Sequence, residues 1–151
     1  MTGEIEREPR HEATVERVYR NDQIEVTWEP GLCIHVGACF RGSPQAFDPR
    51  RRPWVDVGAD RPERIVEVVA QCPTGALHAR WIDRRTQDEP ETPVEVHAQQ
   101  DGPLYVRGAV RVVDQSGKVV REDTRIALCR CGASGNKPFC DDSHFRIGFT
   151  S

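Results

Sequence analysis

The chain has 151 residues, of which 37% are hydrophobic and 30% charged, and its formal net charge is −3 at pH 7. This length and composition are typical of a soluble globular protein with one compact domain or two small ones. The nearly balanced charge argues against nucleic acid as the main partner, since nucleic-acid binding needs a basic face. Because no apolar run approaches membrane-spanning length and residues 1–20 lack the apolar core of a secretory signal, we expect a cytoplasmic protein without a membrane partner.

The N-terminal half is predicted to combine short strands with one helix. Residues 1–18 are polar without a sustained period and are interpreted as an arm. Apolar–polar alternation and breaks at proline and glycine predict three strands, at Ile24–Trp28, Pro53–Val57 and Ala76–Ile82. A helix is expected over Pro62–Gln71, with Asp60 as its N-cap and Glu63 three residues on, as in a capping box. It must end there, because the following Cys72 precedes a proline.

A charged, proline-bearing segment, residues 83–93, is predicted to link this half to a second one. The strands predicted in the second half are Val94–Ala98, Leu104–Val113 and Val119–Leu128, and the last two form a hairpin. The segment after them is rich in glycine and cysteine with little regular pattern. We therefore expect an α+β chain, with one domain at residues 19–82 and another at residues 94–151.

Six cysteines are many for an intracellular chain of this length, and clustered thiols in the cytosol are more often metal ligands than disulfides. Cys129, Cys131, Cys140 and His144 have the spacing Cys-x-Cys-x8-Cys-x3-His. Three thiolates and one imidazole can hold a metal centre without ligands from elsewhere. By ligand types alone, zinc and an iron–sulfur cluster fit about equally well.

The residues between these ligands favour the iron–sulfur cluster. The segment resembles the CDGSH (mitoNEET-like) iron–sulfur family, whose pattern is also matched at Ser134, Pro138, Asp141 and Ser143. Asp142 replaces the family's glycine, and aspartate is among the better-tolerated residues at positive φ. The resemblance implies a β-rich domain with a 2Fe–2S cluster. It places Cys129 and Cys131 on one iron and Cys140 and His144 on the other.

The remaining cysteines are Cys33, Cys39 and Cys72. Bacterial ferredoxins use a Cys-x2-Cys-x2-Cys loop and a remote Cys-Pro. Here the first and third cysteines of such a loop are present, and Val36 stands where the second belongs. The stretch from Tyr19 to Trp81 resembles the divergent single-cluster ferredoxin domain through Cys-Ile-His-Val-Gly-Ala-Cys, Arg-Pro-Trp-Val and Cys-Pro-Thr-Gly-Ala-Leu, which implies a small ferredoxin-like α/β domain.

Three cysteines suit a 3Fe–4S cluster, because valine cannot ligate a further iron. A 4Fe–4S cluster with His35, water or an exogenous ligand on the fourth iron is the alternative. His35 lies one residue from the expected ligand position, and a lone histidine is more often hydrogen-bonded locally than a ligand. His78 and His97 lie on strand-like segments and are interpreted as structural.

All six cysteines are thereby assigned, and no phosphate loop, nucleophile arrangement or carboxylate pair indicates an enzyme. We expect a two-cluster protein that relays single electrons from a ferredoxin reductase to an oxygenase or other oxidoreductase, with a homodimer as one option. Two alternatives stay open. One is a cluster donor or a redox or pH sensor that uses a labile histidine-ligated 2Fe–2S cluster, and the other is a zinc-stabilised interaction module.

Overall fold

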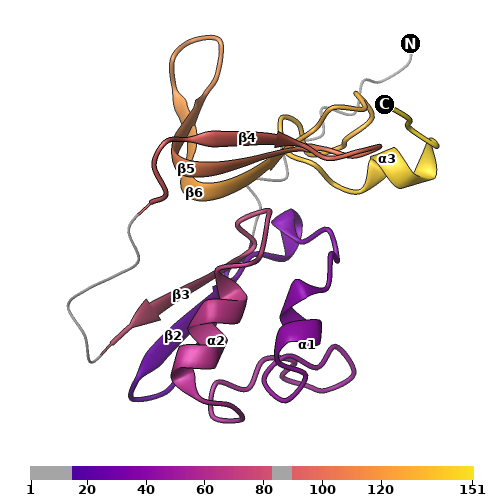
Figure 1. Ribbon diagram of the computed structural model, residues 1–151. Coiled ribbons are helices and arrows are strands. Elements are labelled where there is room, and N and C mark those ends of the chain that lie inside the picture. Colours follow the sequence, from indigo (N-terminus) through magenta and orange to yellow (C-terminus); the bar gives the residue numbers. More distant parts are fainter. Residues whose placement is uncertain (1–14, 83–89) are drawn as a thin grey trace, which may run out of the picture.

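Figure 1 shows a mixed α+β chain with two small sheets. The computed structural model describes residues 15–82 and 90–151. Each sheet has three antiparallel strands, in the orders β1-β2-β3 and β4-β5-β6. The elements are β1 (Arg17–Arg20), β2 (Ile24–Trp28), η2 (Pro30–Leu32), α1 (Ala38–Gly42), α2 (Pro62–Val69), β3 (Leu77–Trp81), β4 (Glu95–Ala98), β5 (Leu104–Val113), β6 (Val119–Leu128) and α3 (Ser143–Arg146). Within these described ranges, no helix is both long and apolar enough to cross a membrane.

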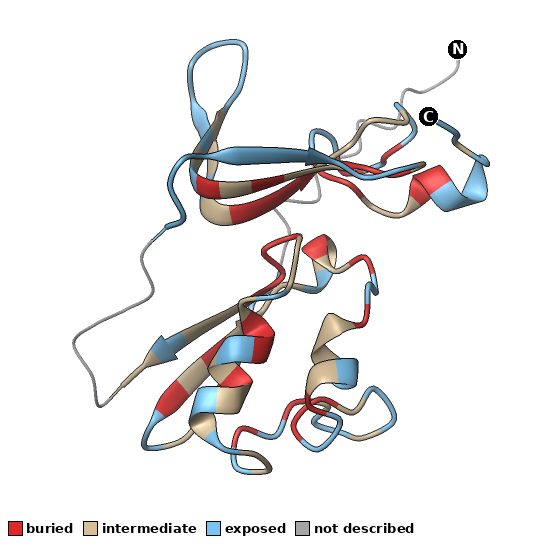
Figure 2. Ribbon diagram, viewed as in Figure 1, coloured by how far each residue is buried: buried red, intermediate tan, exposed pale blue. Residues whose placement is uncertain are grey.

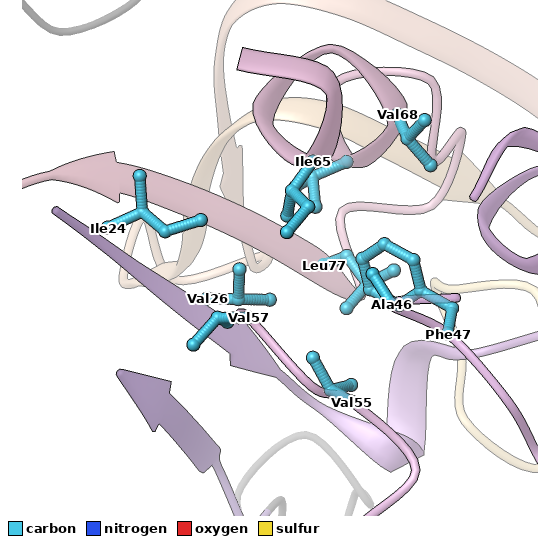
Figure 3. Packing of buried hydrophobic residues seen from close by; sticks show 10 residues of the cluster. Ile24, Val26, Ala46, Phe47, Val55, Val57, Ile65, Val68 and Leu77 are labelled. Carbon is cyan, nitrogen blue, oxygen red and sulfur yellow. The ribbon is translucent and has the colours of Figure 1, made fainter. Parts of the chain in front are cut away.

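Helix α2 packs its apolar side on the first sheet (Figure 3). Ile24 and Val26 alternate along β2 and so point to the same face of the sheet. Ile65 and Val68, three residues apart on α2, lie in the same buried cluster, and all four side chains are fully buried. Burying a side chain of this kind stabilises the fold by about 1.5–3 kcal/mol, so this cluster fixes α2 against the sheet.

The N-terminal half differs from the sequence-based expectations at two strands. Strand β1 begins at Arg17 and takes the last two residues of the predicted arm, whose residues 1–14 lie outside the described part of the chain. The strand predicted over residues 53–57 is wrong. It is replaced by an isolated bridge between Phe47 and Val55, because Pro53 has no N–H to donate to a ladder.

The predicted cap of helix α2 is also wrong. The N-cap residue is Arg61, without a side-chain cap, and the helix ends at Val69, two residues before the predicted end. The Asp60 carboxylate is already engaged, because it accepts hydrogen bonds from the Ser43 hydroxyl and the Arg61 N–H, both at 2.7 Å. Asp60 therefore ties the start of α2 to the end of α1.

In the C-terminal half, β5 and β6 have the predicted bounds and form a long hairpin. Its turn is closed by Asp114, whose carboxylate accepts the N–H groups of Ser116 at 2.8 Å and Lys118 at 3.0 Å. Helix α3 was not anticipated, because four residues carry no detectable period. The linker prediction falls largely on residues 83–89, which lie outside the described residues.

The two halves pack against each other through β6 (Figure 2). Ile126 is fully buried in a cluster that joins Leu32 and Ala76 of the N-terminal half to Phe139 of the C-terminal half. Two halves of this size have thin cores of their own, and a shared apolar interface therefore adds to the stability of both.

Candidate metal centres

The C-terminal ligand candidates come together where the end of β6 pairs with a later loop. Leu128 and Phe139 form an antiparallel bridge. On either side of it, the Cys129 N–H donates to the Pro138 carbonyl at 2.8 Å, and the Cys140 N–H donates to the Ala127 carbonyl at 2.9 Å. This pairing places Cys129 and Cys140 diagonally across the two paired segments, on opposite sides of the bridge. Cys131 follows in the same loop, and His144 is supplied by α3.

The four side chains of this site form two pairs. The Sγ atoms of Cys129 and Cys131 are 3.8 Å apart, and Sγ of Cys140 lies 3.5 Å from Nδ1 of His144. Two thiolates on one tetrahedral metal, each at about 2.3 Å, are separated by about 3.8 Å. The side chains therefore fit a centre with one metal at each pair, and the imidazole faces its partner thiol through Nδ1.

The thiols of this site differ in electrostatic surroundings. Although burial opposes it, the N–H groups of Ser134 and Gly132 hold the pKa of the Cys129 thiol below its ordinary value. Burial, together with the charge of Asp142, raises the pKa of the Cys140 thiol to about 11. A buried thiolate at Cys140 is therefore costly unless a cation compensates it, and a metal supplies that charge.

Asp142 has the left-handed conformation expected at a glycine position, with φ of 74°. Its Oδ1 atom is buried and has no hydrogen-bond partner among the described residues. Burial raises the pKa of this carboxyl, while the charges of His144 and of His35 in the other half oppose the rise. Asp142 thus lies near the residues of both sites. His144 itself is only 5% exposed, which limits its access to water.

The three N-terminal cysteines line one cavity of about 680 Å³. Cys33 follows η2, Cys39 lies in α1 and Cys72 follows α2, so three separate elements position them. Burial raises the pKa of the Cys33 and Cys39 thiols, and the charge of Cys72 adds to the rise at both. The charge of each thiol thus reaches its neighbours, although no three cysteine, histidine or acidic side chains in the described ranges are close enough to share a single metal ion.

Two tryptophans line the same cavity, Trp28 at the end of β2 and Trp54 in the loop before α2. Their rings meet edge to face with centroids 4.9 Å apart. Both indole N–H groups are buried; that of Trp54 has no hydrogen-bond partner among the described residues, and that of Trp28 faces the Cys33 thiol, whose pKa it lowers against the larger effect of burial. Sulfides and metal-bound thiolates accept such bonds, so these donors fit a sulfur-ligated metal centre. Trp54 belongs to the Arg-Pro-Trp-Val stretch that carries the family resemblance, whereas Trp28 has no local motif and was missed.

Val36 and His35 also line the cavity. His35 has a positive φ of 59°, and its Nδ1 atom lies 3.8 Å from Sγ of Cys33. The imidazole therefore contacts the thiol of a proposed ligand. His78 instead pairs with Asp123, Nε2 lying 2.9 Å from Oδ1, and His97 is exposed on β4.

The two sites approach each other at a small apolar contact. Ile34 packs against Ala127 and Cys140 in one buried cluster, with Tyr105 beside it. Burial raises the pKa of Tyr105 to about 12, and the charges of Cys140 and Cys72 contribute to the rise. Tyr105 therefore lies near one thiol of each site.

Comparisons with known proteins agree with this division. A model described as "Divergent 4Fe-4S mono-cluster" matches residues 19–81, and one described as "Iron-binding zinc finger CDGSH type" matches residues 101–145. Two Escherichia coli proteins, of strains K12 and O157:H7, both named "Uncharacterized protein YjdI", are 34% identical over 64 residues, 42% of this chain and 84% of theirs. The chain belongs to the divergent 4Fe-4S mono-cluster family, fused to a CDGSH-type domain.

In this divergent mono-cluster protein, residues 19–81 include Cys33, Cys39 and Cys72. The CDGSH-type match at residues 101–145 includes the candidate ligands from Cys129 to His144. The chain thus carries two iron–sulfur-binding domains, and each matched segment includes the cysteines that the sequence analysis selected.

Proposed function

We propose that this protein is a two-cluster electron-transfer protein that relays single electrons between redox proteins and has no catalytic role of its own. The observation that carries the proposal is the contact between the two sites. Ile34, next to Cys33, lies in the same small buried apolar cluster as Ala127 and Cys140. Two cysteine-rich sites joined through one buried cluster suit one-electron exchange within the chain better than separate structural roles.

The proposed ligands of the C-terminal 2Fe–2S cluster are Cys129, Cys131, Cys140 and His144, in the two pairs whose distances fit one iron each. The proposed ligands of the N-terminal cluster are Cys33, Cys39 and Cys72, in a ferredoxin-like domain over residues 19–82. Val36 at the missing ligand position supports 3Fe–4S. The family description and the contact of His35 with Cys33 support 4Fe–4S with His35 or an exogenous fourth ligand.

Bound clusters would supply the one-electron chemistry, and the chain's own residues set the conditions for it. The half-buried Cys33, Cys39 and Cys72 and the apolar side chains around them limit the access of water to the N-terminal cavity. The indole N–H groups of Trp28 and Trp54 are available to sulfur acceptors there. Hydrogen bonds of this kind stabilise the more negative reduced state and so raise a cluster's potential.

We propose that redox partners dock over the N-terminal cavity. Exposed apolar side chains of Val18, Val36 and Phe40 surround its opening, and Arg17 and Arg52 line it as well. An apolar patch with a basic rim suits brief docking of an acidic redox protein. A ferredoxin reductase as donor and an oxygenase or other oxidoreductase as acceptor fit this chemistry.

The test is iron, sulfide and zinc content, with visible absorption and EPR spectra, on anaerobically purified protein before and after dithionite. Iron and sulfide sufficient for two clusters, with two distinct EPR signals, would support the relay. Oxidised-state EPR would separate 3Fe–4S from 4Fe–4S at the first site. A colourless, zinc-loaded protein would overturn the proposal and leave a zinc-stabilised interaction module.

A cluster donor or redox sensor is the second candidate, and the single histidine ligand is the feature that permits it. The burial of His144 opposes this candidate, because acid-driven release requires water to reach the ring. Transfer of iron and sulfide to an apo-ferredoxin faster than spontaneous decay would favour the donor.

A further inference from the structure

An arginine from the C-terminal half of the molecule donates hydrogen bonds to the loop that carries Cys72. Arg125 of β6 is 7% exposed, and its Nη1 donates to the carbonyls of Val69 and Cys72, both at 2.7 Å. Its Nη2 donates to the Leu77 carbonyl at 2.7 Å and to Nδ1 of His78 at 3.0 Å. One guanidinium thus holds both ends of the loop between α2 and β3.

The same loop lies directly on the backbone of β6. Gly75 has φ of +74°, and a Cβ atom there would collide with the Arg125 carbonyl and lie 2.6 Å from Oδ2 of Asp123. Next to it, Ala76 packs against Ile126. Only glycine satisfies both the conformation and the close approach at position 75. The shape of the Cys72 loop is therefore matched to β6.

Neighbouring side chains on β6 extend this attachment to the Cys33 loop. Arg121, Asp123 and Arg125 are two residues apart and so share one face of the strand. Arg121 donates two hydrogen bonds, at 3.0 and 2.9 Å, to the carboxylate of Glu29, which directly precedes η2 and the Cys33 loop. The Asp123 carboxylate joins Arg121 at 2.7 Å to His78.

The histidine in this network has a defined tautomer. A guanidinium can only donate, so Nδ1 of His78 accepts the bond from Arg125. Nε2 therefore carries the proton and donates to Asp123. These contacts satisfy the polar groups of an interface that would otherwise be costly to bury.

We propose that Arg125 is a positioning residue for the N-terminal cluster, supplied by the CDGSH-type half. It fixes the backbone of Cys72 and places a buried positive charge beside that ligand. The inference rests on the proposed ligand role of Cys72. A residue that orients a metal ligand typically changes metal affinity by about 10- to 100-fold when it is removed. A buried cation also stabilises the more negative reduced cluster, so it raises the potential.

The chain offers a matched control for this arginine. Arg107 of β5 crosses the same interface, where its Nη2 donates to the Ala70 carbonyl at 2.8 Å and its Nε to Glu91 at 3.2 Å. Within residues 15–82 and 90–151, its side chain donates no hydrogen bond to Cys72 or to the loop that follows. The variants to compare in the full, cluster-loaded chain are therefore Arg125→Met, Arg125→Lys and Arg107→Met.

The readouts are the rate at which a chelator bleaches each cluster and the potential of each cluster by EPR-monitored titration. We expect Arg125→Met to lose the N-terminal cluster about 10- to 100-fold faster than wild type and to lower its potential. Arg125→Lys keeps the positive charge but loses the planar guanidinium, which donates from two nitrogens at once. The N-terminal cluster should therefore be lost at an intermediate rate, and its potential should stay close to the wild-type value. Arg107→Met should match wild type, and the 2Fe–2S signal should persist in all three.

Equal behaviour of Arg125→Met and Arg107→Met would overturn the inference. If Arg125→Met fails to fold, judged by a missing 2Fe–2S signal, Arg125→Lys decides: faster loss of the first cluster supports the role, and a wild-type rate refutes it. If wild-type protein carries no iron at Cys33, Cys39 and Cys72, the proposed function fails, and with it the premise of this role. If wild-type protein holds the N-terminal cluster and the Arg125 variants lose it no faster than wild type, only the proposed role of Arg125 is refuted.

Discussion

Ile34 of the N-terminal half shares a buried apolar cluster with Cys140 of the C-terminal half. Each residue belongs to a segment that carries proposed cluster ligands, so one small cluster of side chains lies between the two sites. Tyr105 lies beside this cluster, and the charge of Asp142 reaches Cys33 and His35. Charged and apolar side chains of one proposed site therefore lie in the surroundings of the other.

We predict a magnetic interaction between the two clusters when both are reduced, because each is then paramagnetic and they are close in space. The EPR signal of the reduced 2Fe–2S cluster should be broader and relax faster in wild type than in Cys72→Ser, which lacks a ligand of the first cluster. The control is iron analysis that shows an intact 2Fe–2S cluster in both proteins. Identical 2Fe–2S spectra would contradict the proximity of the sites.

Val36→Cys should convert the N-terminal site to 4Fe–4S, because it restores a thiolate at the position that ferredoxins use for the fourth iron. Val36 already lines the cavity with the three cysteines. An oxidised-state 3Fe–4S EPR signal should disappear, and iron content should rise by about one per chain. If wild type already holds 4Fe–4S, the argument from three cysteines is wrong, and His35→Ala becomes the informative variant.

Trp28→Phe should lower the potential of the N-terminal cluster, because it removes a buried N–H donor that faces the Cys33 thiol and keeps an aromatic ring at the position. The measurement is a redox titration monitored by EPR. Trp81→Phe is the matched control, since Trp81 packs against the core of the same half without lining the cavity. An equal potential in the two variants would mean that Trp28 only fills space.

His144→Cys should lower the potential of the 2Fe–2S cluster and slow its loss in acid. The new thiolate adds negative charge, which lowers the potential. The substitution also removes the imidazole, whose protonation competes with its binding to iron. The rate of bleaching between pH 5 and pH 7 should depend less on pH in the variant than in wild type. The potential of the N-terminal cluster serves as internal control, and a 2Fe–2S potential unchanged by the substitution would argue against His144 as a ligand.

Asp123 should make stability depend on pH. Although burial opposes it, hydrogen bonds from His78 and Arg121 hold the pKa of its carboxyl below the ordinary value. A lowered folded-state pKa contributes stability that is complete above the unfolded value of about 3.9 and is lost as pH falls through the folded value. Urea unfolding of wild type and Asp123→Asn should therefore differ by a constant free energy from pH 7 to pH 5.

Breaking a buried ion pair costs about 3–5 kcal/mol, so we expect a gap of that order between the two proteins at neutral pH. The difference in the free energy of unfolding between wild type and Asp123→Asn should become smaller below about pH 4. A gap that already narrows between pH 7 and pH 5 would contradict the assignment to Asp123.

Sequence by itself determined the parts of this protein that depend on neighbours in the chain. Strands β5 and β6 were predicted with their observed bounds, because long alternating segments report burial of one face directly. The CDGSH-type ligand candidates lie within sixteen residues, so their spacing alone indicated one site. Local patterns failed where a side chain had a distant partner, as Asp60 has in Ser43.

Only the tertiary structure decided how the two halves meet. In the sequence, Arg125 is indistinguishable from the other polar residues of an exposed hairpin. In the structure it is buried and donates a hydrogen bond to the Cys72 carbonyl. Trp28 lines the N-terminal cavity without belonging to a motif, and the buried cluster of Ile34 and Cys140 joins residues from opposite halves. The physical reason is that spacing along a chain reports local geometry, whereas these contacts form only when the packing of two thin cores brings distant segments together.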